Sequence, residues 1–202
     1  MKHDNTKERG AALMLGLMAV LMAGLTLAMD ALLVYTQRVR EEKRAVTVLA
    51  AAKKSLLAYA AVRDALPCPF EGGSESDYED RSQVVLASAS CATNKVGLLP
   101  WAHLQQPPWR DNDGGPIWYA VSGSLSCGAS PTLTINGAGD YVAILLTPGK
   151  ALSGQTRSRA AVATRTDYLE SSNGTSTTAF VSASPSDTFN DRLLGIACSE
   201  IP

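Results

Sequence analysis

The chain has 202 residues, with 18 Lys and Arg against 19 Asp and Glu, so its formal net charge is −1 at pH 7. That length is enough for one domain plus an anchor, and the balanced charge shows neither the basic excess of a nucleic-acid-binding protein nor an acidic tail. Apolar residues are spread unevenly: residues 11–29 carry no charge, whereas the chain from Pro67 onward is rich in Ser, Thr, Gly and Asn.

The first predicted element is a membrane-spanning helix. The stretch KERGAALMLGLMAVLMAGLTLAMDALL, starting at Lys7, contains a run of about twenty apolar residues, which is long enough to cross the hydrocarbon core of a bilayer. Asp30 closes the run, and we place it at the membrane interface, where its carboxylate can reach water. A functional pairing of Asp30 inside the bilayer is the alternative.

The helix is predicted to continue well beyond the membrane. A secretory signal peptide would have a shorter apolar core of about 7–15 residues, followed by a small-x-small cleavage site. Here the run continues without Gly or Pro into VYTQRVREEKRAVTVLAAAKKSLLAYAAV, which is dense in good helix formers. One helix is therefore predicted from about Ala11 to Val62, roughly 78 Å long, so its second half must stand outside the membrane.

The second half of this helix, residues 35–62, is amphipathic. Its apolar residues recur at spacings of three and four and form one face, made of Leu49, Ala52, Leu56 and Tyr59. A helix exposed on all sides would not need such a face. We therefore expect it to cover a sheet supplied by the rest of the chain.

The cysteines indicate on which side of the membrane the domain lies. Basic residues flank the apolar run on both sides, so the positive-inside rule does not choose an orientation. All four cysteines, Cys68, Cys91, Cys127 and Cys198, follow the span. An even number in a small polar domain predicts two disulfides and an oxidising compartment, hence a periplasmic or extracellular domain. Four free thiols in a cytoplasmic domain are the alternative.

Residues 63–202 are predicted to form a β-rich domain. Pro67 and Pro69 end the helix. Short runs with β-branched or aromatic residues then alternate with turn residues, and they begin at Gln83, Pro116, Thr132, Tyr141, Thr178 and Arg192. A long helix followed by strands predicts an α+β fold, with an antiparallel sheet packed on one face of the helix.

The cysteine pairing is left open by the spacing, because four cysteines allow three pairings. We favour Cys68–Cys91, which would close the loop after the helix, and Cys127–Cys198, which would tie the C-terminus to the middle of the domain. Each bridge would contribute roughly 3–4 kcal/mol in the chain-entropy model, less any strain.

No constellation of residues in the sequence indicates catalysis, and we expect no enzyme. The domain has a single histidine, His103, and the chain lacks a G-x-S-x-G nucleophile motif. The tryptophans Trp101, Trp109 and Trp118 lie in one Pro-rich segment, where they form either a binding surface or, as we favour, part of a core.

Two polar segments deserve comparison with ion sites. In RDNDGGP, Asp111 and Asp113 are spaced as at the start of a calcium loop, but the bidentate Glu of the full motif is lacking, and we favour an Asp-Gly turn. YLESSN and FNDRLL carry side chains that cap their loops or meet at an ion site: Glu170, Asn173, Asn190 and Asp191. We predict no cofactor, with calcium as the alternative.

These features together resemble the type IV pilin family, which includes the pseudopilins of type II secretion. In that family a prepilin peptidase cuts after a Gly that ends a short charged leader, and it methylates the new N-terminus. KERGAALMLGLMAVL is similar to that junction, which implies a leader of residues 1–10, cleavage after Gly10 and N-methylation of Ala11. RGAAL is especially similar to certain minor pilins.

The domain adds to the resemblance. WRDNDGGPIWYAVSG is similar to a pseudopilin segment in which an Asp-, Trp- and Gly-rich turn leads into a Tyr-containing strand, and LPCP, GLLPW and TFNDRLLGI are similar to a prepilin-like subgroup. One position departs from the family: most members carry, five residues after the cut, a Glu that neutralises the N-terminal amine of a neighbouring subunit. Here it is Leu15. Because a buried unpaired amine is costly, Leu15 indicates a minor subunit at a tip or initiation complex.

The resemblance implies a pilin-like fold, a single span over residues 11–34 of the inner membrane, and a periplasmic domain that becomes extracellular in a filament. The protein would take part in assembling a type IV pilus or a type II protein-secretion pseudopilus. Its partners would be the prepilin peptidase and other subunits packed on the helix through Gly16, Ala19, Ala23 and Gly24. No nucleic-acid partner is predicted. The alternative is an unprocessed single-span protein whose periplasmic domain binds a ligand or calcium.

Overall fold

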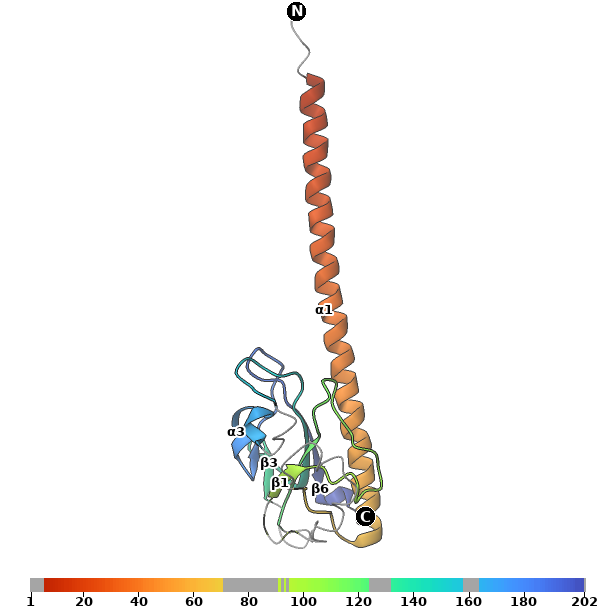
Figure 1. Cartoon of the computed structure of the whole chain (residues 1–202), viewed down its shortest axis with the longest axis vertical. Helices are drawn as coiled ribbons and strands as arrows, with labels where there is room; N and C mark the ends of the chain where they lie inside the picture. Colours follow the sequence, from red (N-terminus) through yellow and green to blue (C-terminus); the bar gives the residue numbers. More distant parts are fainter. Residues whose placement is uncertain are drawn as a thin grey trace, which may run out of the picture. The chain divides into compact units, whose positions relative to one another are not determined.

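A computed structural model gives the structure of the chain (Figure 1), and it describes residues 6–70, 91, 93, 95–123, 132–157 and 164–201. Its elements are α1 Thr6–Arg63, β1 Lys95–Leu98, β2 Trp118–Val121, β3 Leu133–Ile135, β4 Ala138–Thr147, η2 Arg165–Asp167, α3 Ser171–Thr175, β5 Ala179–Phe180, β6 Arg192–Ala197 and η3 Cys198–Glu200. The chain forms two compact units, a helical unit, Met1–Lys43, and a sheet unit, Arg44–Pro202.

Helix α1 is one uninterrupted helix of 58 residues, in agreement with the single long helix that the sequence predicts. It begins at Thr6 rather than at Ala11. The reason is that Lys7, Glu8 and Arg9 are good helix formers, and a lone Gly10 costs only about 1 kcal/mol in a helix interior. The α-helix therefore includes part of the predicted leader.

The helical unit exposes its apolar side chains. Every large apolar residue between Met14 and Tyr35 is at least 51% exposed. By length and composition this part of α1 is able to cross a membrane, in agreement with a single-pass membrane protein.

The sheet unit is built around β4. The strand order is β1-β2-β4-β3-β5, and β6 also pairs with β4. The β1–β2, β2–β4, β3–β4 and β4–β6 pairs are antiparallel. The β3–β5 pair is parallel, which corrects the prediction of an antiparallel sheet. Parallel pairing requires a long connection, and the chain between β4 and β5 supplies it.

Most of the predicted apolar runs form strands. The runs at Pro116, Thr132, Tyr141, Thr178 and Arg192 become β2, β3, β4, β5 and β6, and the run at Gln83 lies outside the described residues. Strand β4 begins earlier than predicted, at Ala138, because Asn136 and Gly137 adopt φ values of 54° and 72° and form a tight hairpin turn with β3. β1 was not predicted.

Both faces of the sheet are buried. On one face, residues of the C-terminal part of α1 pack against the strands: Leu49, Ala52, Leu56 and Ala60 meet Tyr119, Val121, Leu145 and Ile196. The opposite face, which we call the back face, has strand residues Leu98, Trp118, Ile144 and Leu146 covered by Trp101, Tyr168, Leu169 and Phe180. The predicted packing of α1 on a sheet is therefore confirmed.

Candidate functional site

The predicted processing junction lies inside α1. Gly10 and Ala11 are both helical, and the bond between them belongs to a helix that starts at Thr6. Cleavage after Gly10 would remove only the first turn of α1. The helix that remained would begin at Ala11.

The small residues predicted to pack against other helices face open space in the single chain. A Cβ added at Gly16 or Gly24 would meet no other atom within 4 Å. Ala19 and Ala23 are exposed. The structure leaves these positions accessible to a neighbouring helix, without showing one.

Polar groups in the apolar part of α1 are satisfied within the helix where their chemistry allows it. The hydroxyl of Thr26 donates to the carbonyl oxygen of Ala23, and that of Thr36 donates to the carbonyl oxygen of Leu33, both at 2.9 Å. Hydroxyls bonded in this way do not need water, which suits them to a bilayer. Asp30 is exposed at the far end of the charge-free run.

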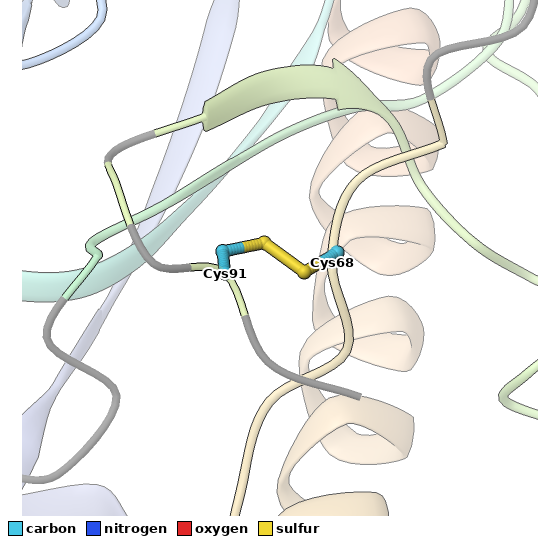
Figure 2. Close-up of a disulfide and its surroundings, with 2 residues drawn as sticks. All are labelled: Cys68 and Cys91. Carbon is cyan, nitrogen blue, oxygen red and sulfur yellow. A yellow bond between two sulfur atoms is a disulfide. The ribbon is translucent and has the colours of Figure 1, made fainter. Parts of the chain in front are cut away.

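A disulfide links the segment after α1 to the segment before β1. The sulfur atoms of Cys68 and Cys91 are 2.07 Å apart, and the pair closes a separation of 23 residues (Figure 2). Both residues are buried in the core beneath α1. This is the pairing that the sequence favours. Cys198 is also disulfide-bonded, and Cys127 lies outside the described residues.

The C-terminal turn is fastened to α1 by a charge pair. Lys53 Nζ lies 2.5 Å from Glu200 Oε1 and donates to the carbonyl oxygen of Gly195 at 3.0 Å. Glu200 Oε2 accepts the backbone N–H of Ala197 at 2.9 Å. The hydrogen bond from Lys53 lowers the pKa of Glu200. Lys53 lies off the predicted apolar face of α1 and fixes the edge of the sheet instead.

The candidate calcium segment forms a turn. Asp111 Oδ1 accepts the backbone N–H groups of Asp113 at 3.0 Å and Gly115 at 2.6 Å. Burial raises the pKa of Asp111 to about 6, although these hydrogen bonds oppose the shift. Asp113 is exposed. Among the described residues no group of three or more His, Cys, Asp or Glu side chains is placed to hold a metal ion.

The second polar cluster brings together residues from three segments. Asp191 Oδ2 accepts the backbone N–H of Glu170 at 3.0 Å and Nδ2 of Asn173 at 2.8 Å. Glu170 Oε2 in return accepts the backbone N–H groups of Asn190 at 3.0 Å and Asp191 at 3.1 Å. Glu170 Oε1 accepts Nε2 of Gln155 at 2.8 Å. The side chains thus cap one another's segments, the loop-capping role considered from the sequence.

Further hydrogen bonds extend this cluster to the residue after β5 and to the loop after β4. Asn173 binds Val181 twice, through Oδ1 at 2.7 Å and Nδ2 at 2.9 Å. Arg157 Nη2 donates to Gln155 Oε1 at 3.0 Å and to the carbonyl oxygen of Tyr168 at 3.3 Å, and its guanidinium lies 5.3 Å from the Tyr168 ring centre. The cluster therefore ties together the segments that cover the back face.

The electrostatics of the cluster are unusual because two carboxyl groups are buried side by side. Asp191 is 0% and Glu170 9% exposed. Burial and the neighbouring charge of Glu170 raise the pKa of Asp191 far above its ordinary range, although the hydrogen bond from Asn173 opposes the shift. Asp191 Oδ1 has no hydrogen-bond partner in the part of the chain that the structure describes.

The aromatic residues singled out in the sequence belong to the core rather than to a binding surface. Trp101 and Trp118 are 3% and 2% exposed in the back-face core, and Trp109 packs partly buried against the core beneath α1. Trp118 also lies 5.8 Å from Tyr168, measured between ring centres. His103 is half-buried, which lowers its pKa.

No protein-family model, curated protein or solved structure matches this chain.

The described polar clusters hold segments of the sheet unit together. Asn173 and Asp191 are fully buried, and the bonded oxygen of Asp111 is occupied by backbone N–H groups. Among the described residues, the exposed large apolar side chains lie mainly in α1 between Met14 and Tyr35. That surface is the basis for a functional proposal.

Proposed function

We propose that this protein is a minor pilin-like or pseudopilin-like subunit. It inserts in the inner membrane through α1, is processed after Gly10, and takes part in initiating or capping a type IV pilus or a type II secretion pseudopilus. Its work is assembly rather than catalysis.

The division of α1 into an exposed and a packed part is the observation that carries this proposal. Leu49 and Leu56 are 2% and 0% exposed against the sheet, whereas Leu15 and Leu21 are 70% and 63% exposed in the same helix. Burying a side chain of this size stabilises by about 1.5–3 kcal/mol. The exposed part therefore needs an apolar environment, which a bilayer offers first and a bundle of similar helices offers later.

Leu15 supports a place at the end of a filament rather than along its length. Its side chain is apolar and cannot accept the charge of a neighbour's N-terminal amine. A repeating subunit would leave such an amine buried without a partner, at a cost of several kcal/mol. A subunit with no neighbour above it avoids this cost. Immunogold labelling spaced along the whole shaft would contradict this placement.

The disulfide supports a periplasmic position for the sheet unit. The Cys68–Cys91 bridge is buried in the core. Disulfides of this kind persist in oxidising compartments and are rare in the cytoplasm. With the sheet unit in the periplasm, the leader would lie on the cytoplasmic side of the membrane, where the prepilin peptidase of the family cuts.

Mass spectrometry of the mature N-terminus tests the proposal. We expect a chain that starts at Ala11 and carries one methyl group, and a Gly10→Leu variant that keeps its leader. Gly16→Ala is the matched control, because the added Cβ meets no atom of the chain within 4 Å, so processing should be unchanged. An intact Met1 in the wild type would overturn the proposal and leave the unprocessed single-span protein as its replacement.

A further inference from the structure

We propose that Glu170 and Asp191 form a binding site for a single proton, which fastens the cover of the back face when bound and loosens it when lost. This inference concerns the sheet unit alone and does not depend on the membrane or filament role. It goes beyond loop capping, because it assigns a ligand to the pair.

The hydrogen bonds of the two carboxyl groups indicate which oxygen atom carries the proton. A carboxylate oxygen in a buried site needs N–H or O–H donors. Both oxygens of Glu170 have N–H donors, and so does Oδ2 of Asp191. Oδ1 of Asp191 has none among the described residues, although Asp191 is 0% exposed. A proton on this carboxyl group forms a hydrogen bond between the two acid side chains and completes the set.

Among the described residues, no cation takes the place of that proton. Neither Glu170 nor Asp191 has a Lys or Arg as a hydrogen-bond or ion-pair partner in the described parts of the chain. The basic side chains on the surrounding elements bind other groups or are exposed. Arg157 donates to Gln155 and to backbone oxygens. Arg165 donates to the carbonyl oxygen of Gly174, Arg192 donates to that of Ala183, and Lys150 is exposed. Asp167, the acidic residue of η2, is half-buried.

Losing the proton would set two negative charges against each other in a buried site. The pair joins the turn before α3, the start of β6 and, through Gln155, the loop after β4. These segments lie next to Tyr168 and Leu169, which cover Trp118 and Leu146. Repulsion at the pair would therefore loosen the cover of the back face first.

The sign of the pH effect follows from linkage. The pKa of Asp191 is raised in the folded protein, so the folded state holds a proton that the unfolded state releases above about pH 4. Stability from this site is fully present below the unfolded pKa and is lost as the pH rises toward the folded pKa. Through that window the unfolding equilibrium constant rises by up to about tenfold per pH unit.

The test is the pH dependence of unfolding of the full chain in detergent, followed by the fluorescence of the buried tryptophans. We expect the wild type to lose stability as the pH rises from about 6 to 8, where the raised pKa of Asp191 lies, and to level off above that pH. In Asp191→Asn, which keeps the shape of the protonated acid, this slope should disappear. Asp113→Asn is the matched control, because Asp113 is exposed, and it should keep the wild-type slope.

Hydrogen exchange locates the effect. After correction for the intrinsic rate, amides of residues 169–181 should lose protection in the wild type as the pH rises, and those of residues 45–60 in α1 should not. If Asp191→Asn does not fold, Glu170→Gln provides the second variant, since removing the neighbouring charge should also flatten the slope. An unchanged slope in both variants would overturn the proposal. So would a stabilisation by Ca²⁺ that depends on Asp191, because the ligand would then be a metal ion.

Discussion

Replacing one leucine in each part of α1 separates packing on the sheet from exposure to a bilayer. Leu56→Ala removes a side chain that is 0% exposed, surrounded by α1 and the strands beneath it. Such substitutions cost about 2–5 kcal/mol, because transfer energy is lost and a cavity remains. For a unit of this size about 3 kcal/mol corresponds to a fall in Tm of roughly 6–12 °C. Thermal unfolding of the full chain in detergent, followed by near-UV circular dichroism, measures it.

Leu21→Ala is the matched control for this substitution. The same atoms are removed from the same helix, but Leu21 is 63% exposed and belongs to the helical unit rather than to the sheet unit. We expect the Tm of the sheet unit to stay within about 1 °C of the wild type, as for surface changes. Equal losses from the two variants would refute the argument, because α1 would then not divide into a packed and an exposed part.

Two further predictions concern the sheet unit. Replacing Cys68 and Cys91 together by Ser should lower the free energy of unfolding by about 3 kcal/mol, since the bridge closes 23 residues of chain. Denaturant titration would show a lower midpoint and a steeper slope, because the unfolded chain without the bridge is less compact. Asp111→Asn should remove a pH dependence: the pKa of Asp111 is raised to about 6, so the wild type loses stability relative to the variant between about pH 4 and 6, and titration at fixed temperature measures the difference. A constant difference across that range would contradict the assignment.

The packing of α1 could be predicted because it depends on a periodic pattern. Leu49, Ala52 and Leu56 are buried as expected. Tyr59 is only partly buried, and Ala60 is the next fully packed residue. From Leu56 a step of four continues the apolar face more closely than a step of three, because the helix repeats every 3.6 residues and the face had already advanced by three and four. The sequence therefore predicts the packed face of α1 correctly but misplaces its last residue by one position.

The strands show where local patterns stop being informative. The turn at Asn136 and Gly137 is a hairpin signal, and it explains why β4 starts at Ala138. Nothing in the two residues of β5 indicates whether it pairs parallel or antiparallel. Its direction is set by the route of the long connection from β4, which includes η2 and α3. The parallel pairing of β3 with β5 therefore cannot be predicted from local sequence patterns.

The buried acid pair is hidden for a similar reason. Glu170 and Asp191 each lie in a segment whose side chains were expected to cap loops or meet at an ion site, and the structure joins the segments by capping. Capping is a local property, so it could be anticipated from residue type. That two carboxyl groups would face each other could not, because their distance depends on how segments 21 residues apart fold onto the same surface.

The different covers of the two sheet faces explain why the acid pair lies where it does. A helix satisfies its own backbone groups, so α1 can cover one face with apolar side chains alone. The back face is covered by short and irregular segments, whose buried N–H groups need acceptors from side chains. A carboxylate accepts several N–H groups at once, and Glu170 and Asp191 together accept five of these hydrogen bonds, three of them from backbone N–H groups. This arrangement buries two carboxyl groups, which would both be charged, and one shared proton neutralises one of the two charges. The pH sensitivity proposed for the back face is thus a physical consequence of covering a sheet with loops instead of a helix.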